Sequence, residues 1–113
     1  MALPRIDFVE LPCSDTESMQ GFYAAAFGWD FTAFGPTYAC TMTGDVDLGV
    51  QADQTEVTAA PLPVIQVTDL DAALTQVEQA GGEITRAIFA FPGGRRFHFR
   101  DPADNEIAAH KPD

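Results

Sequence analysis

The feature that most constrains the fold is that the chain consists of one unit written twice. When Asp15 is placed on Asp69, the two halves align without a gap, and Gly28 falls on Gly82. In each half a strand precedes the aspartate, a helix with an apolar face follows it, and three short strands follow the glycine. Each unit covers only one face of its sheet, so the other face is left for binding. The sequence therefore predicts an α+β fold of two tandem βαβββ modules that form a concave mixed sheet, with the helices on its outer face.

The module boundaries follow from the same alignment. The predicted elements are a strand at 4–13, a helix from Asp15 to Gly28, strands near 29–34, 37–42 and 46–51, a strand at 62–68, a helix from Asp69 to Gly81, and strands near 83–91, 95–100 and 105–110. Residues 52–61 show no periodicity and are expected to be a linker. We expect a single domain over 1–113, with modules 1–51 and 62–113.

Charge and composition exclude several classes of partner. The chain carries 17 acidic residues against 6 lysines and arginines, a formal net charge of -11. Nucleic-acid phosphates and anionic membrane surfaces both require clustered cations, so neither is an expected partner. A hydrophobic content of 46% is typical of a globular domain. No apolar run has the length of a membrane span or the form of a signal peptide, and we expect a cytoplasmic protein.

The stretch FPGGRRFHFRDP, at 91–102, contains three of the chain's six basic residues. Alternate residues of a strand share a face, so Phe97 and Phe99 are expected to pack under the helices. Arg96, His98 and Arg100 then point to the opposite face. Either these arginines pair with surface acids such as Glu10, Asp47 and Glu106, or they bind an anionic ligand.

The same alternation assigns residues of the other strands to this face. The residues expected there are Phe8 and Glu10, Asp47 and Gly49, Leu62, Val64 and Gln66, and Glu106, Ala108 and His110. Aromatic side chains nearby could stack on a ligand or simply form core. The candidate ligand-binding residues are Phe8, Glu10, Trp29, Tyr38, Asp47, Gln66, Arg96, His98, Arg100, Glu106, Ala108 and His110.

The segments FVELPCSD, FYAAAFGWDF, VTDLDAAL, AGGEI and FPGGRRFHFRDPADNEIAAH resemble the vicinal oxygen chelate superfamily. This superfamily includes glyoxalase I, bleomycin and fosfomycin resistance proteins, and extradiol dioxygenases. The likeness covers nearly the whole chain and is greatest to small bacterial glyoxalase-like proteins. It implies paired βαβββ modules, commonly a homodimer, and in the enzymes a divalent metal held by His, Glu or Gln from four strands.

The resemblance places the metal ligands on residues that do not suit a cation. They fall on Phe8, on Leu62 (or Pro63 if the register shifts by one residue), on Gly49 or Asp47, and on Ala108. Hard or borderline cations need oxygen, nitrogen or thiolate ligands, which most of these side chains lack. No cofactor is therefore expected at the family's usual position.

Three functions remain open, and with them the question of whether the protein is an enzyme. The first is a metal-free protein that binds a small organic molecule, in the manner of bleomycin resistance proteins, as a homodimer whose partner covers open apolar surface.

The second is a lyase, isomerase or dioxygenase-like enzyme with a displaced Zn, Ni or Fe site built from Glu10, Asp47, His98 and His110. The third is metal-free acid–base catalysis with His98 as base and Arg96 as its anion-stabilising partner. Glu10 and His98 are the candidate catalytic residues. His110, three residues from the C-terminus, is expected to be exposed to solvent.

Overall fold

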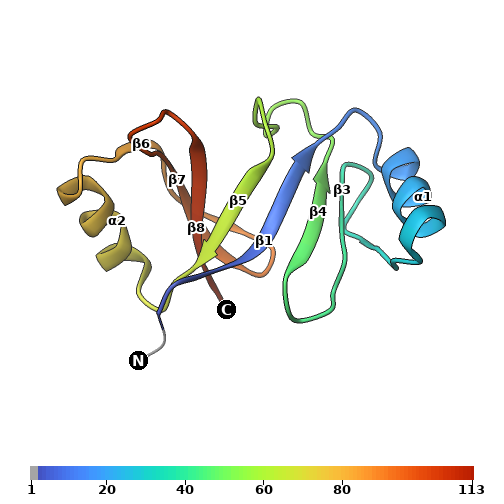
Figure 1. The fold of residues 1–113 in the computed structure, drawn as a ribbon, viewed down its shortest axis with the longest axis horizontal. Coiled ribbons are helices and arrows are strands. Elements are labelled where there is room, and N and C mark those ends of the chain that lie inside the picture. The colour runs from blue at the N-terminus through green and yellow to red at the C-terminus, as the bar shows by residue number, and fades with distance from the viewer. Residues whose placement is uncertain (1–2) are drawn as a thin grey trace. The chain divides into compact units, whose positions relative to one another are not determined.

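The computed structural model describes residues 3–113, and Figure 1 shows the helices and strands that they form. In chain order these are β1 (Arg5–Pro12), α1 (Thr16–Phe27), β2 (Thr32–Ala33), β3 (Tyr38–Cys40), β4 (Asp47–Gln51), β5 (Leu62–Gln66), α2 (Leu70–Gln79), β6 (Glu83–Phe91), β7 (Gly94–Arg100) and β8 (Glu106–Pro112). This order is the strand–helix–three-strand unit written twice. The predicted α+β class and the repeated βαβββ pattern are confirmed.

The chain divides into two compact units, which are described separately. The N-terminal unit is Phe8–Pro61, and the C-terminal unit is Leu62–Asp113 together with the N-terminal residues up to Asp7. Strand β1 contributes residues to both units. No helix within residues 3–113 is long and apolar enough to cross a membrane.

In the N-terminal unit four strands pair in the order β2-β3-β4-β1. Strand β4 is parallel to β1, with Glu10 opposite Gly49, and antiparallel to β3, with Val50 opposite Ala39. Strand β2 is only Thr32–Ala33, shorter than the predicted 29–34. Residues 52–60, after the end of β4, form turns and irregular backbone, as the lack of periodicity indicated.

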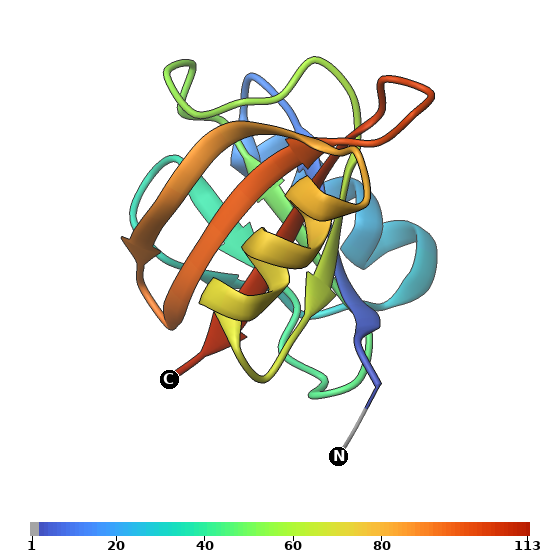
Figure 2. The same cartoon turned by 90° about the vertical axis from the view of Figure 1, so that its left-hand side faces the viewer.

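In the C-terminal unit the strand order is β5-β8-β7-β6. Strand β5 is parallel to β8, while β7 is antiparallel to both β8 and β6. Figure 2 shows helix α2 lying across one face of this sheet. The opposite face therefore has no helix of this unit over it.

Both helices begin at the aspartates that the repeat identified. The Asp15 carboxylate accepts a hydrogen bond from the backbone N–H of Glu17, and Asp69 accepts one from Ala72. These contacts satisfy N–H groups that have no partner inside the helix. Helix α1 ends at Gly28, whose φ of 71° is the left-handed conformation that glycine adopts at least cost.

The core of the C-terminal unit forms between α2 and the sheet. Leu70, Phe97 and Ala109 are buried there, and Phe99 packs against them. Residues 97 and 99 were predicted to face the helix, and they do. Burying a phenylalanine side chain contributes roughly 1.5–3 kcal/mol, so Phe97, which is fully inaccessible, is a principal stabilising residue of this unit.

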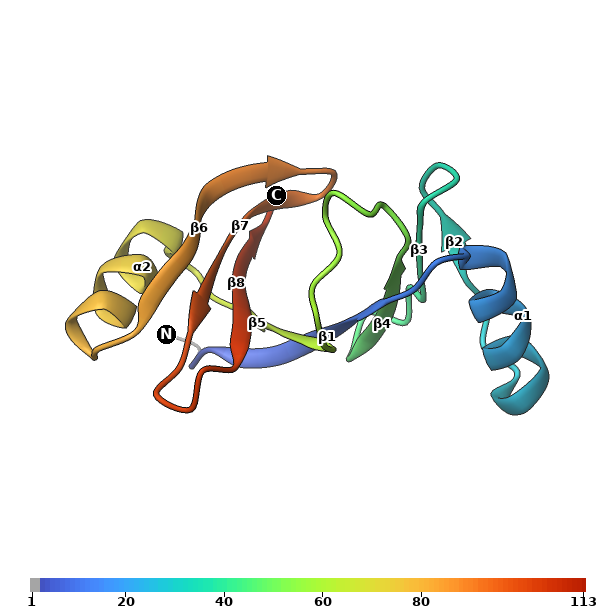
Figure 3. The same ribbon diagram turned by 90° about the horizontal axis from the view of Figure 1, so that it is seen from above.

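Helix α1 packs less closely than its counterpart. It contacts β3 and β4 of the N-terminal unit, and Figure 3 shows this helix from above. Thr16 is its only buried residue, while Phe22 and Phe27 remain 61% and 63% exposed. The apolar helix face expected from the sequence is therefore only partly used within the N-terminal unit.

Candidate functional site

The C-terminal unit carries a group of mainly polar and aromatic residues on the sheet face opposite α2, here called the polar face. It comprises Arg86, Phe89 and Phe91 of β6, Arg96, His98 and Arg100 of β7, and Glu106, Ala108 and His110 of β8. In the strand register Arg96 lies opposite His110, His98 opposite Ala108, and Arg100 opposite Glu106. The strand alternation in the sequence brought together the members on β7 and β8.

The members on β6 were missed for a physical reason. Arg86 lies opposite His98 and Phe89 opposite Arg96, with a register shift between the two pairs. Such a bulge inserts one extra residue into β6 relative to β7. Beyond it, alternation with a period of two no longer predicts which side chains of β6 share a face. The bulge places both Arg86 and Phe89 on the polar face, although their positions differ by an odd number.

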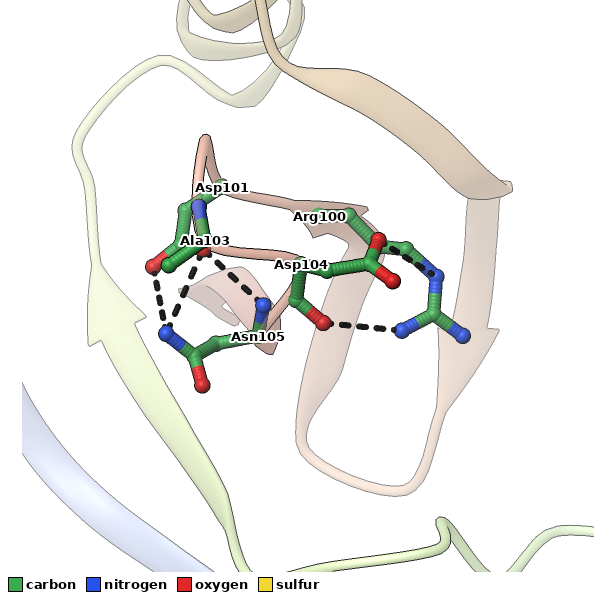
Figure 4. A network of polar contacts seen from close by, with 5 residues as sticks. All are labelled: Arg100, Asp101, Ala103, Asp104 and Asn105. Atoms are coloured by element: carbon green, nitrogen blue, oxygen red, sulfur yellow. Dashed lines mark hydrogen bonds and ion pairs between the residues drawn. The ribbon is translucent and has the colours of Figure 1, made fainter.

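The turn between β7 and β8 aligns the two strands (Figure 4). The Asp101 carboxylate accepts hydrogen bonds from the backbone N–H groups of Ala103 and Asn105, at 3.0 and 2.9 Å, and from the Asn105 side chain. The hydrogen bonds from Asn105 hold the pKa of Asp101 below its ordinary value. Arg100 donates to the carbonyl oxygen of Asp104, whose φ is 69°. This closed turn sets Arg100 opposite Glu106, and so fixes the register of the polar face.

His98 is the most enclosed member of the polar face, with 2% of its surface exposed. Its Nδ1 lies 2.9 Å from Oε2 of Glu106. A carboxylate accepts and does not donate, so the Nδ1 atom carries the proton and Nε2 carries a lone pair. Burial lowers the pKa of His98, assisted by the positive charge of Arg96, while the hydrogen bond that His98 donates to Glu106 opposes the shift. The imidazole is therefore neutral near pH 7.

The Nε2 atom of His98 is buried and has no hydrogen-bond partner within residues 3–113. Buried polar atoms in proteins are nearly always hydrogen-bonded, and an exception calls for an explanation. The atom is thus a free acceptor on the polar face.

Cations and aromatic rings surround this imidazole. The Phe89 ring lies 5.8 Å from the His98 ring, between centroids. The guanidinium carbon of Arg86 is 3.6 Å from the Phe89 centroid, and that of Arg96 is 5.3 Å from it. Arg96 also lies 5.5 Å from the centroid of Phe91. Stacking on an aromatic ring holds a guanidinium group in a fixed orientation and leaves its positive charge in place.

His110 differs from its prediction. It was expected to be exposed, but its side chain is only 14% exposed, and its Nε2 lies 2.9 Å from Oδ1 of Asp7. The other oxygen of Asp7 accepts a hydrogen bond from the Gln66 amide at 3.1 Å. Asp7 was not among the predicted site residues, because alternation along β1 assigned it to the face of Val9 and Leu11. No local pattern links a carboxylate and an imidazole this far apart in the chain.

Three candidates of the N-terminal unit, Phe8, Glu10 and Tyr38, lie close to one another around Gly49. Glu10, 2% exposed, accepts a hydrogen bond from the Tyr38 hydroxyl at 3.0 Å. A Cβ atom at Gly49 would lie 2.5 Å from the Phe8 ring and 2.6 Å from the Tyr38 hydroxyl. Phe8 and Tyr38 thus occupy the space where a longer side chain at residue 49 would project.

Asp47 was one of three acids offered as possible partners of the arginines at 91–102, and in the structure its hydrogen bonds are made within its own unit. Its carboxylate accepts hydrogen bonds from the side chains of Thr41 and Thr43, at 2.7 and 2.8 Å, and from the backbone of Thr43 and Gly44. Burial pushes the pKa of Asp47 upward, but these hydrogen bonds outweigh it and hold the pKa below its ordinary value. Asp47 organises the turn between β3 and β4.

The residues do not suit a divalent metal. No group of three or more His, Cys, Asp or Glu side chains in the described part of the chain is arranged to hold one. At the positions implied for the C-terminal module, Leu62 and Ala108 are apolar and fully buried. The proposed displaced set draws Glu10 and Asp47 from the N-terminal unit and His98 and His110 from the C-terminal unit, so neither unit supplies three of its members.

An open cavity of about 600 Å³ lies in the N-terminal unit, and the predicted candidates Trp29 and Asp47 line it. Trp29 stacks on Tyr23, with ring centroids 5.4 Å apart and ring planes 9° apart. All the residues that line this cavity belong to Phe8–Pro61, so it is a feature of the N-terminal unit by itself.

Comparison with known proteins agrees with this architecture. Residues 5–109 match the model of the Glyoxalase/Bleomycin resistance protein/Dioxygenase superfamily. No curated protein matches the chain. Similar solved structures include methylmalonyl-CoA epimerase from Mycobacterium tuberculosis, with a TM-score of 0.73 and 17% identity over 96% of this chain and 87% of that one.

Two further structures show the same fold. Hypothetical protein BH1468 from Bacillus halodurans C-125 has a TM-score of 0.81 and 9% identity, covering 99% of this chain and 96% of the other. The Mn(II)-bound glyoxalase from Novosphingobium aromaticivorans has a TM-score of 0.69 and 19% identity, over 96% of this chain but 40% of its own length. At these identities the likeness concerns the fold alone, whereas the family model spans nearly the whole sequence. The chain belongs to the Glyoxalase/Bleomycin resistance protein/Dioxygenase superfamily.

Proposed function

We propose that the protein binds a small organic anion on the polar face of the C-terminal unit, without a divalent metal. The observation that carries the proposal is the buried Nε2 atom of His98, which has no hydrogen-bond partner among the described residues. Leaving a buried acceptor unsatisfied costs about 1–3 kcal/mol, so a ligand that donates a hydrogen bond to it regains that energy on binding.

The surroundings of His98 favour a negative charge on the ligand. Arg86 and Arg96 lie over the ring of Phe89, and guanidinium groups pair with carboxylates through two parallel hydrogen bonds. The rings of Phe89 and Phe91 supply flat apolar surface beside these cations. The expected ligand therefore combines a carboxylate with a hydroxyl or N–H donor and an apolar body.

Metal-free binding is supported by the donor set. The positions that the superfamily's enzymes use for a metal are occupied here by side chains such as Leu62 and Ala108, which have no donor atoms. The two histidines of the chain contact different carboxylates: His98 contacts Glu106, and His110 contacts Asp7. Binding would then depend on the arginines and His98 rather than on a Lewis acid.

A second candidate function is acid–base catalysis, which the His98–Glu106 contact favours. A carboxylate that holds Nδ1–H orients the imidazole and stabilises the imidazolium that forms when Nε2 takes a proton. A substrate hydroxyl or an acidic C–H placed at Nε2 would be the proton donor. Glu10, the other catalytic candidate, accepts a hydrogen bond from the Tyr38 hydroxyl, and its own unit, Phe8–Pro61, contains no histidine.

We also propose that the protein is a homodimer. Six large apolar side chains among residues 3–113 are each more than half exposed: Leu3, Ile6, Phe22, Phe27, Met42 and Val46. Exposed apolar surface of this kind is commonly covered by a second copy of the same chain. Sedimentation equilibrium across a range of concentrations tests this, and a monomer at all concentrations contradicts it.

The binding proposal is tested by calorimetry in the presence of EDTA with a panel of hydroxy acids and their neutral amides. We expect acids to bind and the matched amides to bind at least roughly tenfold more weakly, because a hydrogen bond to a charged group is lost. His98→Asn keeps a donor toward Glu106 but removes the atom at the Nε2 position, and it should weaken binding by a similar factor. Equal affinity for acid and amide, or binding that EDTA abolishes, contradicts the proposal.

A further inference from the structure

The cavity in the N-terminal unit has a different chemical character from the polar face. Its volume of about 600 Å³ lies within the range typical of small-molecule sites. Apolar side chains from β1, β4 and the turn before β4 line it, including Val9, Val46 and Leu48. We infer that this cavity is a second binding site, which takes a small organic cation with an apolar body, such as a quaternary ammonium compound.

The aromatic wall of the cavity is held in place by other rings. Trp29 stacks on Tyr23 and lies 5.3 Å from Phe27, between ring centroids. Trp29 itself is 41% exposed, so part of the indole remains accessible to solvent. The face of an indole ring carries partial negative charge and attracts cations more strongly than other aromatic side chains do.

Two carboxylates share the cavity with Trp29. Asp30 and Asp47 both line it, and neither forms an ion pair with a residue that the structure describes. Asp47 remains ionised because the hydrogen bonds from Thr41, Thr43 and Gly44 lower its pKa. Among the described residues that line the cavity there is no lysine, arginine or histidine. The charge within the cavity is thus entirely negative.

The end of helix α1 adds to this potential. Gly28, which caps the helix, also lines the cavity. The carboxyl end of a helix carries a partial negative charge, which a basic residue in the last turn often offsets. The last turn of α1, Ala24–Phe27, contains no basic residue. A bound cation would occupy the position where that charge is uncompensated.

These charges argue against a second copy of the chain as the occupant. A protein surface that covered Asp30 and Asp47 would remove two charges from water, which is costly unless cations pair with them. The chain has 6 basic residues in all, and Arg95, Arg96 and Arg100 lie within the strand β7. A small cation meets the requirement directly and leaves the rim of the cavity in solvent.

The test uses benzyltrimethylammonium as the probe and the chain's single tryptophan as the reporter. We expect a saturable change in Trp29 fluorescence at constant ionic strength. The neutral isostere neopentylbenzene is sparingly soluble, so 3,3-dimethylbutan-1-ol is compared with choline as the matched pair. The cation of that pair should bind at least roughly threefold more tightly than the alcohol, in line with the strength of cation–aromatic contacts.

Variants separate the charge from the general acidity of the protein. Asp30→Asn keeps the shape of the side chain, and it should weaken binding of benzyltrimethylammonium by roughly three- to tenfold. Glu78→Gln removes the same charge from the exposed surface of α2 in the other unit and should change the affinity less than twofold. His98→Asn should also leave cation binding unchanged, so this site and the proposed anion site are tested independently.

Three results would overturn the inference. The first is equal affinity for choline and the neutral alcohol, which would mark the cavity as apolar only. The second is an equal loss of benzyltrimethylammonium affinity in Asp30→Asn and Glu78→Gln, which would mean that binding depends only on the net charge of the protein. The third is a pair of observations: the probe causes no change in Trp29 fluorescence, and Trp29→Ala dissociates a dimer of the protein. Together these would identify a second copy of the chain as the occupant of the cavity.

Discussion

His98 on β7 and Glu106 on β8 lie 2.9 Å apart, from Nδ1 to Oε2, although they are diagonal and not directly opposite in the strand register. The contact joins the two strands through buried polar groups and fixes which nitrogen of the imidazole carries the proton. Its effect on the pKa of His98 is smaller than that of burial, which lowers the pKa. The balance of these two effects makes the protein's stability dependent on pH.

The first prediction concerns that pH dependence. In the unfolded chain His98 titrates at its ordinary value of 6.5, and in the folded protein its pKa is lower. Above pH 6.5 both states hold a neutral imidazole, so its full contribution to stability is present. As the pH falls through this value, the unfolded state takes up a proton first and the folded state loses stability.

Urea unfolding at about pH 7.5 and about pH 5.5 checks this prediction. The decrease in unfolding free energy at the lower pH should be smaller in His98→Asn than in the unmodified protein. Glu78→Gln serves as a control whose pH dependence should match that of the unmodified protein. If His98→Asn leaves the pH dependence unchanged, the imidazole is not the group responsible.

The second prediction compares two glycines. A methyl group at Gly49 would lie 2.5 Å from the Phe8 ring and 2.6 Å from the Tyr38 hydroxyl, so Gly49→Ala forces both side chains to move. Overpacking of this kind costs about 1–3 kcal/mol. Gly21, inside α1, has nothing within 4 Å of a new methyl group, and Gly21→Ala should stabilise the protein by about 0.5–1 kcal/mol. Chemical denaturation of both variants measures the difference, and effects of the same sign would contradict it.

Much of the fold could be predicted from the sequence, because its signals are local. The helix starts at Asp15 and Asp69 depend on hydrogen bonds two or three residues away. The burial of Phe97 and the opposite orientation of Arg96 and His98 depend on the period of a single regular strand. These predictions required no knowledge of which strands are neighbours.

The parts of the site that were missed depend on pairings across the sheet. Phe89 joins the polar face because of a bulge in β6, whose register shift has no mark in the sequence. Asp7 and His110 meet although they stand at opposite ends of the chain. The role of Asp47 in the turn between β3 and β4 was also missed, although the hydrogen bonds that its carboxylate accepts from Thr41 and Thr43 are local in the sequence.

The third prediction concerns the core beneath α2. Phe97 is completely buried, and Phe97→Ala should cost about 3–5 kcal/mol because it leaves a cavity between the sheet and the helix. Phe22→Ala is the matched control, since Phe22 is 61% exposed and makes only an edge contact with Tyr23. Its expected cost is below about 1 kcal/mol. A comparable loss of unfolding free energy in both variants would mean that α1 is covered in solution.

The fourth prediction concerns the contact between Asp7 and His110. Asp7→Ala removes the acceptor for both His110 and Gln66, whose donors are largely buried, and should cost about 1–3 kcal/mol. Asp113→Ala removes an exposed aspartate near the same end of the sheet and should change the unfolding free energy by less than about 0.5 kcal/mol.

A double-mutant cycle isolates the pair from other effects of each substitution. In a protein that already carries His110→Ala, Asp7 accepts one hydrogen bond fewer, so Asp7→Ala has less to remove. The double variant should therefore lose less stability than the sum of the two single variants. The expected coupling is about 0.5–3 kcal/mol, the range found for side chains in direct contact. Strict additivity of the two substitutions would show that the contact contributes nothing to stability. In that case the burial of His110 would have to be explained by the packing of its ring against Phe91, whose centroid lies 6.4 Å away.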